Sequence, residues 1–223
     1  MSKATRFLRD NGLTIALVGV FLLCLGGMVW AGWISENQDL LAHDRPTLSL
    51  LAYFLSSSFQ SALFENWESE FLQMSAYVIM TAFLFQRGSA ESKDPDGNNP
   101  EDEDPAKKRH DQKTPWPVRA GGLWSFIYSY SLGLALLALF LASFILHWLG
   151  SAASANEEAG MHGLPQQTLL HYLADAQLWF ESFQNWQSEF LSTAVLVVLS
   201  IMLRHRGSPE SKPVADPHSK TGH

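Results

Sequence analysis

Long uncharged hydrophobic runs alternate with short polar segments along this chain of 223 residues. One run occupies residues 12–33, directly after a basic N-terminal segment, and another occupies residues 123–148. An α-helix rises about 1.5 Å per residue, so a run of this length crosses the roughly 30 Å hydrocarbon core of a bilayer. The pattern therefore predicts a membrane-spanning helix in each run.

The first run has an alternative interpretation as a cleaved signal peptide, with Val29-Trp30-Ala31 as the cleavage pattern. The run is long for that purpose, and it has a counterpart deep inside the chain that cannot be a signal peptide. We therefore expect residues 12–33 to remain as a membrane anchor.

Two further crossings are expected at residues 66–86 and 185–203, where a polar, Trp-bearing start precedes a hydrophobic run and a basic end. In the earlier one, Asn66 can cap the helix and Trp67 suits the headgroup level of a bilayer. Trp186 takes the place of Trp67 in the later one. Both tryptophans are predicted to be interface anchors.

The chain is an internal duplication with an offset of 119 residues. Residues 64–72 (FENWESEFL) recur at 183–191 (FQNWQSEFL), and RGSAESK at 87–93 recurs as RGSPESK at 206–212. Each repeat is expected to cross twice, so both copies enter the membrane in the same direction as parallel repeats. We predict an all-α membrane protein with four transmembrane helices as two parallel two-helix repeats, each with an outer interfacial amphipathic helix.

Composition divides the chain further. Residues 94–118 are rich in Asp, Glu, Asn, Pro and Lys, and residues 213–223 are polar, so we predict a disordered linker and a disordered tail. The two repeats are expected at residues 1–93 and 119–212. The outer helix of the first repeat is expected within residues 47–64. Its apolar stripe would consist of Leu48, Leu51, Leu55 and Phe59.

Basic residues set the expected orientation. Lysines and arginines flank the four crossings on one side, and Arg45 alone falls in the outer segments, which are otherwise acidic. The positive-inside rule makes the basic side cytoplasmic. We therefore predict a multi-pass protein embedded in the lipid bilayer, with cytoplasmic N- and C-termini.

The doubled Asn-Trp-x-Ser-Glu-Phe-Leu, each copy followed by Arg-Gly-Ser-x-Glu-Ser-Lys, resembles an uncharacterised family of small bacterial four-pass membrane proteins, classed as a domain of unknown function. The resemblance covers nearly the whole chain. It implies a bacterial origin and location in the inner membrane, and it supplies no activity, ligand or catalytic residue.

The strongest candidate for a polar or cation site is Glu70 with its repeat counterpart Glu189. Two facing carboxylates could share a proton or hold a cation, and an ionisable residue at membrane depth is a candidate for function. Glu65 and Glu68 are replaced by glutamine in the second repeat, whereas this pair keeps its charge. Helix capping and the helix dipole explain the same residues, so a structural role stays open. The candidate site comprises Glu70, Glu189, Asn66, Asn185, Ser69 and Ser188.

Histidines give a second, weaker candidate. His43 and His162 occupy equivalent places, each three residues before a proline. With the paired glutamates they could form a metal or pH-sensing site, and as the alternative they set the turn before the outer helix. His147 and His171 have no histidine at the matched position, and we interpret them as interfacial.

Other chemistry has little support in the sequence. RGSxESK has one glycine and no suitably spaced lysine, so it fits a helix stop better than a phosphate loop, and its Glu-Ser-Lys leaves room for an unknown cytoplasmic partner. No nucleophile with a neighbouring base is readable, and the basic residues are not gathered into a nucleic-acid patch. The single cysteine, Cys24, excludes an intrachain disulfide. No cofactor is expected.

With 47% hydrophobic and 17% charged residues, the composition is that of a membrane protein with solvated segments. We expect a non-enzymatic structural or accessory membrane protein, with a homo-oligomer as a candidate assembly. The alternative is a cation or proton transport component that uses Glu70 and Glu189. A membrane enzyme is a remote third hypothesis.

Overall fold

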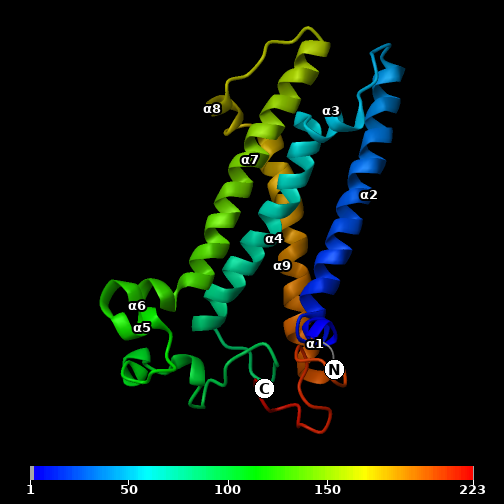
Figure 1. Cartoon of the computed structure of the whole chain (residues 1–223). Helices are drawn as coiled ribbons and strands as arrows, with labels where there is room; N and C mark the ends of the chain where they lie inside the picture. Colours follow the sequence, from blue (N-terminus) through cyan, green and yellow to red (C-terminus); the bar gives the residue numbers. More distant parts are fainter. Residues whose placement is uncertain (1–2, 223) are drawn as a thin grey trace. The chain divides into compact units, whose positions relative to one another are not determined.

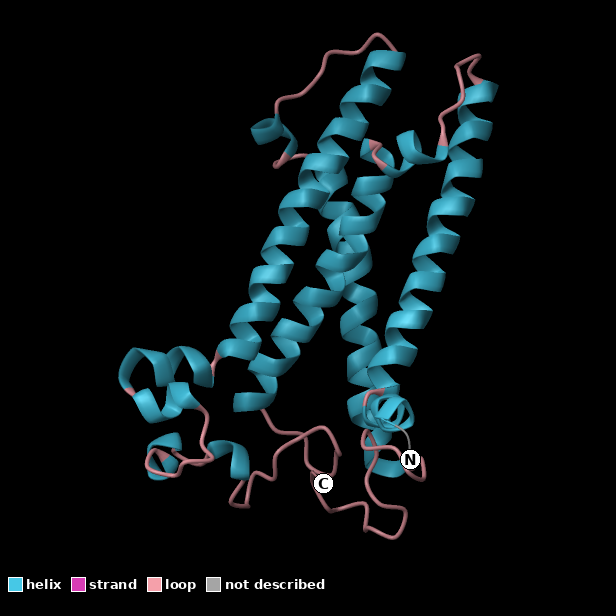
Figure 2. Ribbon diagram, in the orientation of Figure 1, coloured by secondary structure: helices cyan, strands magenta, loops and turns pink. Residues whose placement is uncertain are grey.

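A computed structural model describes residues 3–222, and all regular structure within that range is helical (Figures 1 and 2). The predicted all-α class is confirmed. The elements are α1 (Lys3–Asp10), α2 (Gly12–Ala42), α3 (Leu50–Phe54), α4 (Ser57–Phe83), the 3-10 helices η1 (Pro100–Asp102) and η2 (Pro105–Lys108), α5 (Trp116–Ala120), α6 (Gly122–Ser129), α7 (Ser131–Met161), α8 (Leu169–Tyr172) and α9 (Ala176–Met202).

The duplication extends to the ends of the helices. α2 and α7 have 31 residues each, and α4 and α9 have 27 residues each. Both pairs are offset by the same 119 residues that relate the sequence motifs. α3 and α8 also begin at equivalent positions, Leu50 and Leu169. Each repeat therefore consists of a long helix, a turn, a short helix and a second long helix.

The same hydrogen bonds close the turn after the first long helix of each repeat. Asn37 Nδ2 donates to the Leu48 carbonyl at 3.1 Å, and Asn37 Oδ1 accepts from the Leu48 amide at 2.6 Å. Asn156 makes the same two bonds with Gln167, at 2.9 and 2.8 Å. A side-chain amide has both a donor and an acceptor, so one asparagine satisfies both backbone groups of a distant residue. This bond pair fixes how the chain returns after the helix.

Within the described residues, two helices, α2 and α7, are long and apolar enough to cross a membrane. The sequence predicts four crossings, and α4 and α9 are not apolar enough by the same measure of length and composition. They begin at Ser57 and Ala176, well before the expected starts at 66 and 185, and their first halves carry Glu, Gln and Asn side chains. These polar first halves lower the hydropathy of both helices.

Some helix boundaries also differ from prediction. The expected crossing at 123–148 starts in α6, breaks at Tyr130 and continues in α7. In place of one outer helix over 47–64, there are α3 and the first turns of α4, because the Ser56 hydroxyl accepts from the Phe59 amide and starts a new helix.

The helices form two compact units. Unit 1 comprises the chain up to Leu63 together with Leu149–Gln167, and unit 2 comprises Phe64–Trp148 and Thr168–His223. In this division α4 and α7 each contribute one part to either unit.

In unit 1, α3 and the residues before it pack closely on α2. Trp33 Nε1 donates to the Leu48 carbonyl at 2.7 Å. A Cβ added at Gly32 would lie 2.1 Å from the Tyr53 hydroxyl oxygen, so this position accepts only a glycine while the buried Tyr53 stays in place. The turn bonds of Asn37 lie one helical turn further along.

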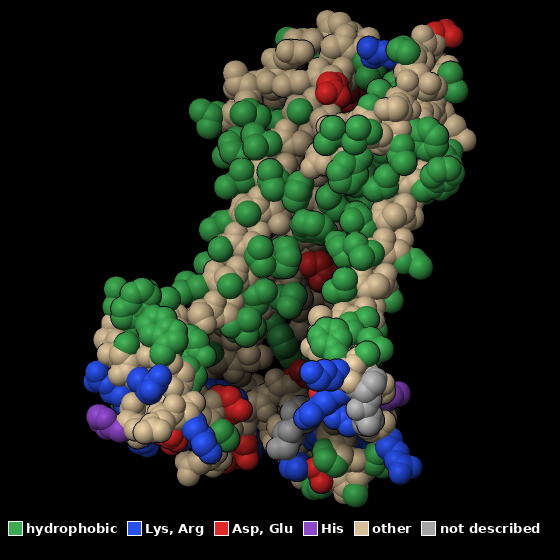
Figure 3. Space-filling view, in the orientation of Figure 1, with side chains coloured by type: hydrophobic (Ala, Val, Ile, Leu, Met, Phe, Trp, Pro, Cys, Tyr) green, Lys and Arg blue, Asp and Glu red, His purple; other side chains and the backbone are tan. Residues whose placement is uncertain are grey.

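Unit 2 has an unusually polar interior. The buried side chains there include Glu68, His147, Lys212 and several serines, whereas many Leu, Ile, Val and Phe side chains of the long helices are exposed. On the face seen in Figure 3, hydrophobic side chains cover the long helices. Large exposed apolar surfaces are typical of proteins that contact lipid or a partner.

The segments predicted to be disordered have local structure. Residues 94–118 contain η1, η2 and α5. In the tail region, the buried Lys212 ammonium donates to three backbone carbonyls, those of Gly88, His218 (3.0 Å) and Lys220 (2.8 Å). Composition reports polarity and not these specific bonds, which is why it did not predict the defined position of the tail.

Candidate functional site

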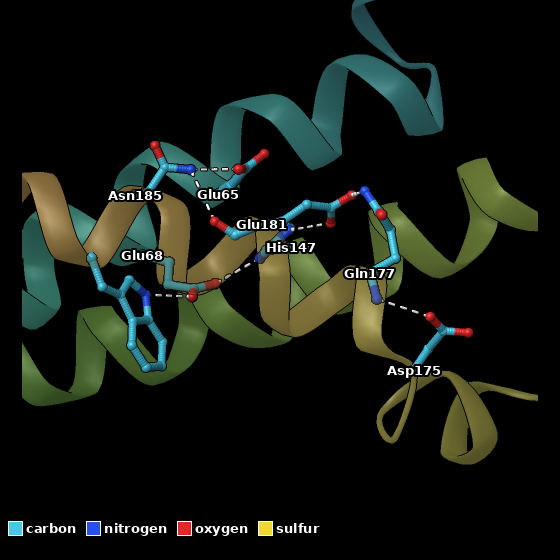
Figure 4. A network of polar contacts seen from close by, with 8 residues as sticks. Glu65, Glu68, His147, Asp175, Gln177, Glu181 and Asn185 are labelled. Carbon is cyan, nitrogen blue, oxygen red and sulfur yellow. Dashed lines mark hydrogen bonds and ion pairs between the residues drawn. The ribbon is translucent and has the colours of Figure 1, made fainter.

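Three ionisable side chains from three helices form a continuous chain in unit 2 (Figure 4). His147 of α7 lies between Glu68 of α4 and Glu181 of α9. Its Nδ1 is 2.7 Å from Glu68 Oε2, and its Nε2 is 3.2 Å from Glu181 Oε2. One imidazole therefore links all three helices.

The chain of Glu68, His147 and Glu181 runs from the protein interior toward the surface. The side chains of Glu68 and His147 are 0% exposed, whereas the side chain of Glu181 is 21% exposed. A buried ionised group is strongly destabilising unless it has hydrogen-bond partners. Glu181 is accordingly the residue through which the three side chains can exchange protons with solvent.

The second oxygen of each carboxylate also has a donor. Trp186 Nε1 donates to Glu68 Oε1 at 2.8 Å. Gln177 Nε2 donates to Glu181 Oε1 at 2.9 Å. All four carboxylate oxygens of the chain therefore accept or share a hydrogen bond, and α4 gains a direct link to α9 through Trp186.

A third acid extends this network. Asn185 Nδ2 donates to Glu65 Oε1 and, at 3.2 Å, to the Glu181 carbonyl (Figure 4). Asp175 accepts from the Gln177 amide at 2.9 Å and caps the start of α9, which places Gln177 beside Glu181. Side chains of the first turns of α9 therefore contact this network of ionisable residues.

Aromatic rings enclose the Trp186 side of the network. The Trp186 ring lies 5.3 Å from that of Phe183, 6.2 Å from Phe140 and 6.4 Å from Trp179, measured between centroids. Such rings exclude water, and hydrogen bonds are electrostatically stronger in a dry, low-dielectric environment. The Glu68 end of the chain is therefore the more strongly bound end.

This arrangement has two chemical capabilities. Charge-assisted hydrogen bonds are roughly twice as strong as neutral ones, so the chain can hold three helices together. An imidazole between two carboxylates can also accept and pass on a proton, because histidine changes protonation near neutral pH more readily than any other side chain.

The predicted pair, Glu70 and Glu189, lies outside this chain. Glu70 is exposed and Glu189 is half-buried, and the two carboxylates interact electrostatically. Ser69 and Ser188 each donate to a carbonyl of their own helix, three residues earlier. The structure therefore brings the two glutamates near each other but gives the serines only local roles.

The predicted anchors behave differently from each other. Trp67 is half-buried against Phe64, with ring centroids 5.4 Å apart. Trp186, which the sequence places at the membrane interface, instead donates to the buried Glu68. Asn66, expected as a helix cap, lies within α4, and Asn185, a candidate site residue, lies within α9 and binds Glu65. Because α9 begins nine residues before Asn185, Asn185 and Trp186 both lie inside the helix and face α4.

His43 and His162 lie where α2 and α7 end. The His43 amide donates to the carbonyls of Asp39 and Leu40, and the His162 amide makes the equivalent bonds in its repeat. Within residues 3–222, no group of three or more His, Cys, Asp or Glu side chains could hold a metal ion. The geometry places these histidines in the turn before the outer segment.

The sequence comparison between repeats missed His147 and Glu68, because it searched for residues that occur in both copies. The equivalent positions hold Met28 and Gln187. A usable signal was present in the sequence nonetheless: His147 is the one residue of the hydrophobic run 123–148 that is Asp, Glu, His, Lys or Arg, and such residues are candidates for function.

Within residues 3–222, these features define an all-helical protein with two helices long and apolar enough to span a membrane and a buried row of ionisable residues. This protein belongs to the family described as Domain of unknown function (DUF6766), whose model matches residues 4–223. No curated protein and no solved structure matches the sequence of this protein.

Proposed function

We propose that this protein is a four-pass membrane protein of the bacterial inner membrane, in which α2, α4, α7 and α9 cross as two parallel two-helix repeats. Both termini would face the cytoplasm, and lipid would surround the helices. Its role would be structural or accessory rather than enzymatic. The many exposed Leu, Ile, Val and Phe side chains of the long helices support this placement.

The proposal includes α4 and α9 as crossings despite their lower hydropathy. Each has 27 residues and is about 40 Å long, which exceeds the hydrocarbon core. Residues 71–83 and 190–202 contain no Asp, Glu, Lys or Arg. In α4, Glu68 lies buried in the network, so its charge would not contact lipid. Hydropathy alone therefore understates how well these helices suit a membrane.

Cysteine labelling tests the placement. In a Cys24→Ser background, single cysteines at Asn98 in the linker and at Thr47 in the outer segment would be treated with a membrane-impermeant maleimide. We expect Thr47→Cys to react in intact cells and Asn98→Cys to react only after the membrane is opened. Reaction of Asn98→Cys in intact cells would overturn the orientation.

One observation carries the structural role: the fully buried Glu68 is bound by His147 from α7 and by Trp186 from α9. His147→Ala removes the residue that touches both other helices. We expect the purified variant to unfold at a clearly lower temperature in detergent, whereas Met28→Ala, at the equivalent position of the first repeat, should change little. Equal melting temperatures for His147→Ala and the wild type would contradict this role.

A second candidate function is cation or proton transport through the Glu70 and Glu189 pair. It is favoured by the proximity of two acids at equivalent repeat positions, one exposed and one half-buried. A Glu70→Gln, Glu189→Gln double variant in proteoliposomes tests it. Loss of ion flux with intact folding would support transport, and unchanged flux would leave the structural role.

A further inference from the structure

We propose that the Glu68–His147–Glu181 chain is a proton-binding site. It holds one proton in addition to the single N–H of a neutral imidazole. Loss of this proton opens the contact between α7 and α9. The inference rests on the contacts of these residues alone. It goes beyond the structural role above and would hold whether or not the protein conducts ions.

The number of protons follows from the two ring contacts. His147 Nδ1 and Nε2 each lie within hydrogen-bond distance of a carboxylate oxygen, at 2.7 and 3.2 Å. Each contact needs one hydrogen between nitrogen and oxygen, because two lone pairs at this distance repel. A neutral imidazole carries one N–H, and an ionised carboxylate carries none. The second hydrogen must therefore be a proton taken from solution.

The surrounding donors locate this extra proton. Trp186 Nε1 already donates to the outer oxygen of Glu68, and Gln177 Nε2 donates to the outer oxygen of Glu181. Neither group can accept a hydrogen in return: an indole N–H and an amide NH2 are donors only. The proton thus lies in one of the two ring contacts, and because an imidazole is more basic than a carboxylate, it lies on the ring as an imidazolium between two carboxylates. The three side chains together then carry a net charge of −1.

Among the described residues, 3–222, the titratable groups that face the imidazole are acidic. Glu65 and Glu68 lie on α4, and Glu181 lies on α9. Three carboxylates around one buried ring create a negative potential that attracts a proton. Partly exposed Glu181 provides the route between this proton and solvent, because it is the only one of the three chain members with appreciable exposure.

Loss of the proton has a defined structural consequence. The remaining hydrogen is expected to stay on Nδ1 and donate to Glu68, because this contact is shorter and fully buried. Unprotonated Nε2 would then present its lone pair to the ionised carboxylate of Glu181, and the two would repel. This longer contact would therefore open, and water would hydrate Glu181. Trp186 would still hold α9 to α4 through Glu68. The proton would therefore control the contact of α7 with α9 specifically.

Nitrogen-15 NMR of the full chain in detergent micelles, with labelled histidine, tests the proposal. The His147 signals would be assigned by their loss in His147→Gln. At pH 7 we expect neither ring nitrogen of His147 to show the chemical shift of a bare acceptor. As the pH is raised, Nε2 should acquire that shift while Nδ1 keeps its proton. A bare ring nitrogen at every pH between 5 and 9, in folded protein, would overturn the proposal.

A matched pair of variants separates proton binding from the structural role. In Glu181→Gln, the side-chain amide can donate to Nε2, so the extra proton is no longer required and His147 should be neutral at pH 7. Glu189→Gln makes the same chemical change two turns along α9 and should leave the His147 signals unchanged. Retention of the extra proton in Glu181→Gln would contradict the site. If that variant fails to fold, the wild-type titration still decides the question, and the structural role is judged independently by His147→Ala.

Discussion

The turns that follow the helices are the same in the two repeats, whereas the buried ionisable site is not. In the turns, the same bonds recur: Asn37 and Asn156 close equivalent turns, and the Ser92 and Ser211 hydroxyls accept from the amides of Gln86 and His205 at 2.8 and 2.9 Å. In the buried site, Glu68, His147 and Glu181 correspond to Gln187, Met28 and Ala62. The scaffold is thus present twice and the ionisable chain once.

This difference indicates where a specific role resides. Turns must return the chain at the same angle in both copies, so their hydrogen bonds repeat. A buried carboxylate is destabilising wherever it lacks partners, so it can occur only where a neighbouring helix supplies them. The second repeat supplies His147, Glu181 and Trp186 to the glutamate of the first. One asymmetric site is therefore built on a symmetric scaffold.

The largest effect is expected at the buried glutamate that only the first repeat has. Glu68→Ala leaves the ring N–H of His147 and the indole N–H of Trp186 without their shared acceptor inside the protein. We expect the free energy of unfolding to fall by about 3–5 kcal/mol. Gln187→Ala, at the equivalent and exposed position, should change it by less than about 0.5 kcal/mol. Equilibrium unfolding in mixed detergent micelles measures both. Similar losses for the two variants would contradict the asymmetry.

A smaller effect is expected at Gly32, which makes a close contact with a tyrosine side chain at a position where the second repeat has no glycine. Gly32 faces the Tyr53 hydroxyl, whereas Ser151 occupies the equivalent position in the second repeat. Gly32→Ala should lower the free energy of unfolding by about 1–3 kcal/mol through overpacking. Adding Tyr53→Phe removes the hydroxyl oxygen nearest to the new methyl group and should restore part of the lost stability.

Gly27→Ala is the matched control, since nothing lies within 4 Å of its added Cβ. An alanine in a helix is favoured over glycine, so this variant should be neutral or stabilised by up to about 1 kcal/mol. If Gly32→Ala behaved like Gly27→Ala, the close packing of α3 on α2 would not hold in the protein.

The sequence predicted the parts of the fold that depend on local pattern. Hydrophobic runs located α2 and α7, and the repeated motifs identified the duplication, because helix periodicity and turn residues act over short distances along the chain. The RGSxESK motif had no explanation beyond a helix stop. The structure supplies one: its first serine accepts from the glutamate amide, and its second serine accepts from the amide just before the motif, in both copies.

The site depended on contacts that no local pattern reports. Glu68 and His147 are 79 residues apart in sequence, and Glu68 and Trp186 are 118 apart. Glu70 and Glu189 appeared more significant because both repeats keep them, but shared residues identify shared structure. The chain of Glu68, His147 and Glu181 exists only when α4, α7 and α9 come together, and three-dimensional packing was therefore needed to reveal it.

The repeated turns predict equal effects in both copies. Ser92→Ala and Ser211→Ala each remove one acceptor for a backbone amide, which is worth about 1 kcal/mol. The two losses in the free energy of unfolding should agree within about 0.5 kcal/mol, and the double variant should show their sum. Chemical unfolding of the three variants in detergent checks this. A large difference between the single variants would show that the two turns are not equivalent.

The smallest effect is expected at the surface, where the repeats differ without structural consequence. Arg87 pairs with Asp96 at 2.5 Å, whereas Ala215 occupies the position equivalent to Asp96. Arg87 lowers the pKa of this carboxyl through a hydrogen bond and charge attraction. The pair therefore adds its stability above the pKa of an unpaired aspartate, about 3.9, and loses it as the pH falls through the lowered value. Because both side chains are exposed, Asp96→Asn should leave the melting temperature at pH 7 nearly unchanged and remove only a slight dependence below pH 4. A clear loss of stability at neutral pH would show that this ion pair, unlike other exposed pairs, holds the linker in place.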